Sequence, residues 1–125
     1  MINFNKNGIF NLKPIEIEKV REDAKGLLVE GEEILMAFKT IRDQLFFTNK
    51  RIVAVDVQGI GLKKSYATMP YSKIQFFSVR TAGFELVPDA ELFVMFNNGF
   101  TANFEFRGRV DIRAIGQAIS HYVLD

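Results

Sequence analysis

The sequence contains no cysteine and only one histidine. Without cysteine there can be no disulfide framework, thiolate metal site or cysteine nucleophile, because each of these needs a sulfur atom. A chain without cysteine is also compatible with a reducing compartment, and we expect a cytoplasmic protein. The single histidine further limits the acid–base and metal chemistry that the chain can perform.

The chain also lacks an excess of either charge and any long hydrophobic run. Sixteen Lys and Arg residues against fifteen Asp and Glu give a net charge of +1, so no nucleic-acid partner is expected. No stretch approaches the roughly 20 apolar residues that span a bilayer. The start, MINFNKNGIFNL, lacks the basic region and apolar block of a signal peptide. We expect a soluble protein with one domain, residues 1–125.

Hydrophobic residues are abundant, at 48% of the chain with thirteen Phe, and they fall mainly in short alternating runs. The pattern of residues 44–57, QLFFTNKRIVAVDV, predicts two strands joined by a tight turn at Asn49, a residue that tolerates the backbone conformation of such turns. Asn98-Gly99 predicts a second hairpin. Seven strands are predicted between residues 33 and 106. This apolar load indicates that a partner covers part of the surface.

Two segments have helical spacing. Residues 14–30 predict an amphipathic helix that begins near Pro14 and ends at Gly31, and residues 110–124 predict a second helix with Asp111 near its start. Short strands with hairpin-length links predict a mainly β protein. Its expected fold is a bent antiparallel sandwich or partly open barrel, capped by the C-terminal helix and carrying an extra N-terminal helix.

Four segments resemble a known family. They are LLVEGEEILMAFK, residues 41–79, TAGFELVPDAEL and VDIRAIGQAISHYVL, and the most distinctive pieces are FTNKRI and PYSKI. The chain resembles the bacterial pleckstrin-homology-like domain family, which implies a seven-stranded pleckstrin-homology-like fold and ring-like homo-oligomers in place of catalysis. Eukaryotic relatives by fold often bind phosphoinositides through the loop joining the first two strands. Here that link contains only Lys39, Arg42 and Asp43, too short and nearly neutral for such a head group.

The side chains that catalysis would need are scarce, and we expect no enzyme, no cofactor and no metal site. His121 is predicted in the last turn of the C-terminal helix, where it faces solvent or the negative helix end. The carboxylate pairs Glu32-Glu33 and Asp89-Glu91 lack the spacing of a calcium loop and are predicted to be solvated.

Two further patterns are candidate ligand sites. Residues 59–61, Gly-Ile-Gly, lack the third glycine of a dinucleotide loop and are interpreted as a turn. Lys63, Lys64 and Lys73 form a candidate strip for anionic lipid, with a low expected affinity of about 1 kcal/mol per cation. Ordinary solvated lysines are the alternative interpretation.

Paired aromatic residues occur at Phe46-Phe47 and Phe76-Phe77. Neighbouring strand residues point to opposite faces, so one ring of each pair is expected in the core. The other ring is expected under a helix, in an interface or in a ligand groove.

These patterns together favour a non-enzymatic, self-associating binding or scaffold module. The alternative is a peripheral membrane adaptor at the inner membrane face with weak binding to anionic phospholipid. Residues 1–12 are too apolar for a disordered tail and are predicted to form oligomer contacts. The candidate contact residues are Ile2, Phe4, Ile9, Phe10 and Leu12.

Overall fold

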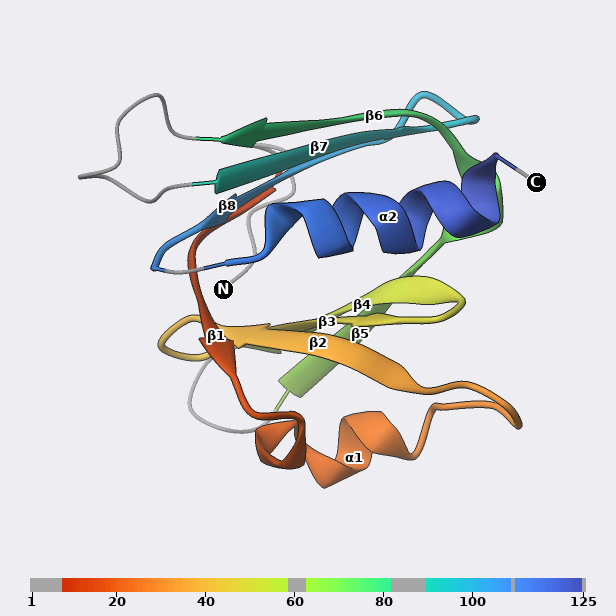
Figure 1. Ribbon diagram of the computed structural model, residues 1–125. Coiled ribbons are helices and arrows are strands. Elements are labelled where there is room, and N and C mark those ends of the chain that lie inside the picture. The colour runs from red at the N-terminus through yellow and green to blue at the C-terminus, as the bar shows by residue number, and fades with distance from the viewer. Residues whose placement is uncertain (1–7, 59–62, 82–89, 109, 125) are drawn as a thin grey trace.

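The computed structural model describes residues 8–58, 63–81, 90–108 and 110–124 (Figure 1). The described residues form eight strands: β1 (Gly8–Ile15), β2 (Ile34–Lys39), β3 (Gln44–Thr48), β4 (Arg51–Gln58), β5 (Lys63–Pro70), β6 (Ile74–Thr81), β7 (Ala90–Phe96) and β8 (Thr101–Phe106). The helical elements are η2 (Ile17–Lys19), α1 (Glu22–Lys25), η3 (Tyr71–Lys73) and α2 (Ile112–Val123).

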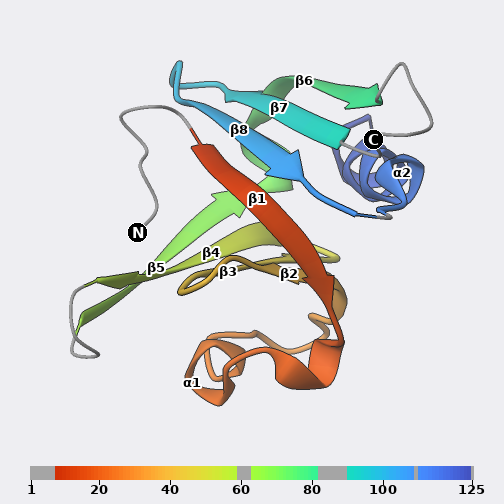
Figure 2. The ribbon, with the colours of Figure 1, turned by 90° about the vertical axis from the view of Figure 1, so that its left-hand side faces the viewer.

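All eight described strands belong to one bent sheet in the order β5-β4-β3-β2-β1-β8-β7-β6. The sheet folds into two halves, β2–β5 and β6–β8, and α2 closes one open side between them (Figures 1 and 2). The mainly β, bent and incompletely closed fold with a C-terminal capping helix is therefore confirmed. Its free edges are β5 and β6.

Strand β1 joins the two halves, and it is the strand that the sequence did not predict. It pairs in parallel with β8 and antiparallel with β2. Gly8 lies against β8 so closely that a Cβ atom would collide with the carbonyl oxygen of Asn103. A residue with a side chain could not keep this approach. The predicted N-terminal arm is therefore, from Gly8 onwards, an interior strand of the sheet.

The main core lies between the two halves and under α2. Phe38, Phe47 and Phe106 meet there with ring centroids 4.7 to 6.4 Å apart. Helix α2 contributes Ile112, Ile115 and Ile119, all buried. The Asp111 carboxylate accepts a hydrogen bond from the Ala114 N–H and caps the helix, in agreement with the predicted start.

A second, smaller core lies on the outer side of the β2–β5 half. Phe46, Val53 and Val55 point outward from β3 and β4, and Val20 and Ala24 cover them. All five side chains are buried. Residues 16–30 therefore act as a lid over one outer face of the sheet, as Figure 1 shows for α1 below the lower half.

The predicted helix over residues 14–30 is wrong in extent. Helical structure there is confined to Ile17–Lys19 and Glu22–Lys25. Pro14 and Ile15 belong to β1, where they pair with β2. Val20 is extended and separates the two turns. Pairing with β2 outweighs the helical preference of these residues, which is itself weak, because short helices gain most of their stability from packing.

Both predicted hairpins are confirmed. The chain reverses between β3 and β4 at Asn49, and between β7 and β8 at Asn98-Gly99, where Gly99 has a φ of 88°. That left-handed conformation costs glycine nothing. The predicted continuous meander is wrong in one respect: β2 to β5 and β6 to β8 each form a meander, but β5 and β6 lie at opposite edges of the sheet, and β1 lies between β2 and β8.

Candidate functional site

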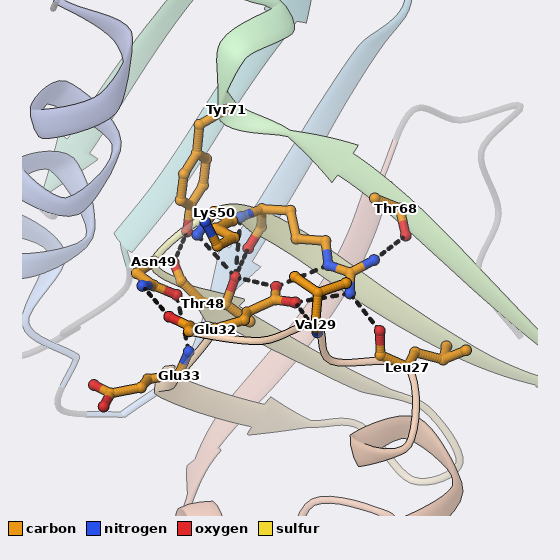
Figure 3. Close-up of polar contacts among 11 residues, drawn as sticks. Leu27, Val29, Glu32, Glu33, Thr48, Asn49, Lys50, Thr68 and Tyr71 are labelled. Atoms are coloured by element: carbon orange, nitrogen blue, oxygen red, sulfur yellow. Dashed lines mark hydrogen bonds and ion pairs between the residues drawn. The ribbon is translucent and has the colours of Figure 1, made fainter.

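Among the buried polar groups of the described residues, the carboxylate of Glu32 is at the centre of a hydrogen-bond network (Figure 3), and its side chain is fully buried. It accepts hydrogen bonds from Arg51 Nε at 2.8 Å, Arg51 Nη2 at 2.9 Å and the Thr48 hydroxyl at 2.7 Å. Burial raises the pKa of Glu32, but the bonds from Arg51, Thr48 and the Val29 N–H lower it by more. The net pKa falls from 4.5 to about 2.

Further bonds connect this ion pair to the surrounding chain. Arg51 donates to the Leu27 carbonyl at 2.8 Å, and the Tyr71 hydroxyl donates to the Thr48 carbonyl at 2.7 Å. Burial, followed by the nearby Tyr122 and Glu32, raises the pKa of Tyr71. The network attaches the lid to the β3–β4 hairpin. The donors and acceptors of this network bond to one another, which is typical of a network that stabilises the fold.

The prediction that Glu32 is solvated is therefore wrong, whereas Glu33 is exposed as expected. Sequence reasoning failed because the partner of Glu32 lies nineteen residues away, across a hairpin. Asn49 adds to the same attachment: its side chain donates to the Gly31 carbonyl and accepts from the Glu33 N–H. The predicted turn residue thus has a second role.

The remaining candidate catalytic groups are dispersed. His121 is exposed in the last turn of α2, edge-on to Tyr122 at 4.8 Å. Glu91 lies 3.5 Å from Arg80. Asp89 and residues 59–61 lie outside the described part of the chain. Within that part, no three acidic or histidine side chains are close enough together to hold a metal ion, and no helix is long and apolar enough to cross a membrane.

The three candidate lysines do not form a strip. Lys63 and Lys64 begin β5, and Lys73 follows its far end. Eight residues of strand separate them by about 23 Å. Lys64 Nζ also lies 2.8 Å from an Asp23 carboxylate oxygen, and this hydrogen bond lowers the pKa of Asp23 to about 2. The predicted cationic strip is therefore not present.

The candidate oligomer contacts in the N-terminal arm divide into two groups. Ile9 and Leu12 are buried in the core of their own chain, so their prediction as intermolecular contacts is wrong. Pairing of β1 inside the sheet accounts for this, because it places both side chains between the two halves. Ile2, Phe4 and the side chain of Phe10 lie outside the described part of the structure.

The outer face of the β6–β8 half has no lid among the described residues. Phe76 points outward from β6, is 50% exposed and lies 6.1 Å from Phe93 in an edge-to-face contact. Met95 is directly opposite Phe76 on β7 and is half-buried. We call Phe76, Phe93 and Met95 the outer patch. Its neighbour Phe77 packs into the main core, so the Phe76-Phe77 pair splits as predicted.

The two free edges of the sheet differ chemically. Strand β5 begins with Lys63 and Lys64 and ends at Pro70, and charge and proline both discourage pairing with another strand. Strand β6 has neither lysine nor proline, and Arg80 is its one charged residue. Only its first residues contain a bulge. The edge beside the outer patch is therefore the less protected one.

A basic recess of about 920 Å³ lies beside the β2–β3 turn. Among its described lining residues the cations are Lys13, Lys39, Arg42 and Arg107, and the one carboxylate is Asp43. Sequence reasoning weighed only the three groups in the turn. Arg107 was missed because it is 96 residues from Asn11, whose side-chain oxygen accepts a hydrogen bond from Arg107 Nε. No local signal in the sequence identifies that neighbour.

An acidic groove of about 450 Å³ follows the recess along the β1–β2 pair. Lys13 opposite Lys39 lines the recess, and the next pair, Pro14 opposite Phe38, lines the groove. Its charged lining residues in the described chain are Glu16, Glu18 and Asp111. Its floor includes Ile17 and Leu35, which are 39% and 40% exposed. This groove was not predicted either.

Comparisons with known proteins define the class to which this architecture belongs. The model of the bacterial PH domain family matches residues 3–123. The chain therefore belongs to the bacterial PH domain family, and the predicted pleckstrin-homology-like fold is confirmed. Proteins of this family are generally non-catalytic binding modules.

Individual relatives agree with this assignment. The chain is 33% identical to YozO of Bacillus subtilis (strain 168) over 93% of its length and 97% of the relative. It is 44% identical to YjqA of the same organism over 66% of each chain.

Two solved structures share the fold. One is a DUF1696 family protein with a pleckstrin-homology domain from Shewanella loihica PV-4, with a TM-score of 0.75, 29% identity, and coverage of 91% of this chain and 98% of that chain. The other is a pleckstrin homology domain from Shewanella amazonensis SB2B, with a TM-score of 0.64, 33% identity, and coverage of 89% and 90%.

Proposed function

We propose that this protein is a non-enzymatic, self-associating binding or scaffold module of the cytoplasm. The observation that carries the proposal is the unprotected edge of β6 beside the exposed outer patch. An edge strand presents unpaired N–H and C=O groups that readily pair with a strand of another chain. The partner that we propose is a second copy of this protein.

The side chains next to the edge favour the same contact. When a second β6 pairs with the first, the sheet continues across the interface and Phe76 of each copy is brought towards the other. Burial of a large apolar side chain contributes roughly 1.5 to 3 kcal/mol before ordering costs. The edge of β6 thus combines backbone pairing with apolar burial, whereas the lysines of β5 oppose both.

This contact replaces the arm as the principal interface of the proposal. A two-fold pairing of β6 with β6 stops at a dimer, and a ring requires a head-to-tail contact. The ring-like assembly implied by the resemblance therefore needs a second interface. Ile2, Phe4 and Phe10 remain candidate contributors from the arm.

A matched pair of edge variants tests the proposal. Ser78→Lys places a charge on exposed β6, and Ser65→Lys places the same charge on exposed β5. We expect the first to lower the solution mass measured by light scattering and the second to leave it unchanged. Equal masses for the two variants and the wild type would contradict the role of β6.

The second candidate function is a peripheral membrane adaptor that binds anionic phospholipid at the inner membrane face. The basic recess favours it, together with Ile41, which is fully exposed at the tip of the β2–β3 turn. An apolar tip beside cations suits the interface of an anionic bilayer. We expect salt-sensitive flotation with phosphatidylglycerol vesicles that is reduced by Arg42→Gln. Flotation that is unchanged in high salt would contradict this mode.

A further inference from the structure

Two neighbouring hollows have opposite charge in a chain that is nearly neutral. The basic recess holds four cations and one carboxylate, and the acidic groove holds three carboxylates and no cation among its described lining residues. The whole chain has a net charge of only +1. Charge is therefore sorted locally on this surface, with the two signs side by side along the β1–β2 pair.

Three of the four cations of the recess have no carboxylate partner among the described residues. Lys13 and Lys39 are directly opposite each other on β1 and β2, and like charges in that position are destabilising. Lys13, Lys39 and Arg42 make no ion pair with any described carboxylate. Arg107 differs, because it lies 3.1 Å from Glu105. An external carboxylate would relieve the repulsion between the two lysines.

Asp43 does not supply that compensation. Its carboxylate is buried and accepts a hydrogen bond from the Val57 N–H at 2.9 Å. Its backbone carbonyl accepts from the Thr40 N–H, and its own N–H donates to the Thr40 hydroxyl. Asp43 therefore holds the β2–β3 turn in shape, with Ile41 and Arg42 presented at the tip.

Ile41 is the most exposed large apolar side chain of the described residues. It is flanked by the cations Lys39 and Arg42 of the recess. The acidic groove has the complementary composition: the partly exposed Ile17 and Leu35 line it together with Glu16 and Glu18. One surface is an apolar knob with cations around it, and the other is an apolar hollow with carboxylates around it.

We propose that the β2–β3 turn of one copy binds the acidic groove of a second copy. Ile41 enters the groove against Ile17 and Leu35, while Lys39 and Arg42 meet Glu16 and Glu18. Complementary charges select the orientation of the contact, and apolar burial at its centre supplies affinity. The inference rests on the proposed self-association, to which it adds a knob-and-groove interface separate from the β6 edge.

The acidic groove favours a second copy of the protein over a membrane as the partner of the β2–β3 turn. An anionic bilayer matches the recess and Ile41, but it gives no role to an apolar hollow surrounded by carboxylates. A second copy uses both surfaces at once. This contact joins two different patches, so head-to-tail repetition closes a ring when the rotation divides a full turn.

Charge reversal tests the interface. The turn variant Lys39→Glu with Arg42→Glu and the groove variant Glu16→Lys with Glu18→Lys should each weaken association at least about tenfold, because each reverses two charges and makes their contacts with the other copy repulsive. Mixing the two variants should restore association, since each reversed surface then finds a complementary partner. Dilution series monitored by light scattering give the apparent dissociation constants.

Two controls separate this inference from the alternatives. Lys63→Glu with Lys73→Glu changes the same amount of charge outside the recess and should leave association unchanged. Ile41→Ser should weaken it about fivefold through lost apolar burial.

Failure to restore association on mixing would overturn the knob-and-groove contact while leaving self-association through β6 intact. A wild-type chain that stays monomeric would overturn both. Loss of vesicle flotation in the turn variant, with no change in its mass, would assign the turn to a membrane and overturn the inference.

Discussion

The two outer faces of the sheet carry similar apolar residues but differ in whether the chain covers them. On the β2–β5 half, Phe46 points outward and is fully buried under residues 16–30. On the β6–β8 half, Phe76 points outward and is 50% exposed. A phenylalanine on a strand therefore does not reveal what covers it. The covered face stabilises the monomer, and the uncovered face is available to a partner.

The largest expected effect comes from breaking the covered face. Phe46→Ala should lower the free energy of unfolding by about 3 to 5 kcal/mol, because it leaves a cavity under the lid. Urea denaturation at a fixed protein concentration measures it. Phe76→Ala is the matched control and should cost under about 1 kcal/mol, since its ring is already half in water. Equal losses for both variants would remove the distinction between the two faces.

The attachment of the lid gives the next largest effect. Glu32→Gln should cost about 3 kcal/mol, because Arg51 would keep its charge and lose its carboxylate partner in a buried setting. Glu33→Gln alters the exposed neighbour and should change the free energy of unfolding by less than about 0.5 kcal/mol. If both variants are equally stable, the lid is not held by this ion pair.

Acid should release the same attachment. The folded pKa of Glu32, about 2, is below its ordinary value of 4.5. A depressed pKa means that the stabilisation is complete above about pH 4.5 and is lost as the pH falls towards 2. The loss should reach about 2 to 3 kcal/mol. Asp23 titrates in the same window, so the comparison is between wild type and Glu32→Gln, whose stability should fall less steeply with acid.

The sequence predicts the elements that depend on interactions between residues close together in the chain, and it does not predict those that depend on distant residues. Strands β2 to β8 and helix α2 follow from alternation, turns and helical spacing, all of which are local. The placement of β1 does not, because its parallel pairing with β8 joins residues about 95 positions apart. The same reason hides the partner of Glu32 and the meeting of Lys13 with Arg107 in the recess.

The resemblance to a family supplied the fold but not the surfaces. The lysines at 63, 64 and 73 looked like a strip because they are close in sequence, yet an extended strand carries its ends far apart. The acidic groove went unnoticed because its carboxylates come from β1–η2 and from the cap of α2. The local sequence predicts a surface only where all the residues of that surface come from one helix or strand.

The variant Phe76→Ala should have the smallest effect on the free energy of unfolding and a clear effect on self-association. Phe76→Ala leaves the core untouched, so its unfolding should resemble that of the wild type, but its apparent association should weaken about fivefold or more through lost apolar burial. Sedimentation of the variant over a dilution series checks this. Unchanged association would show that the outer patch contributes nothing to the interface.

The solution mass of the full-length wild-type protein tests the central claim most directly. Light scattering at micromolar concentration should give a mass of at least twice the 14.3 kDa of one chain, because our proposal places a second copy over the β6 edge and its outer patch. A mass of 14.3 kDa at that concentration would contradict self-association.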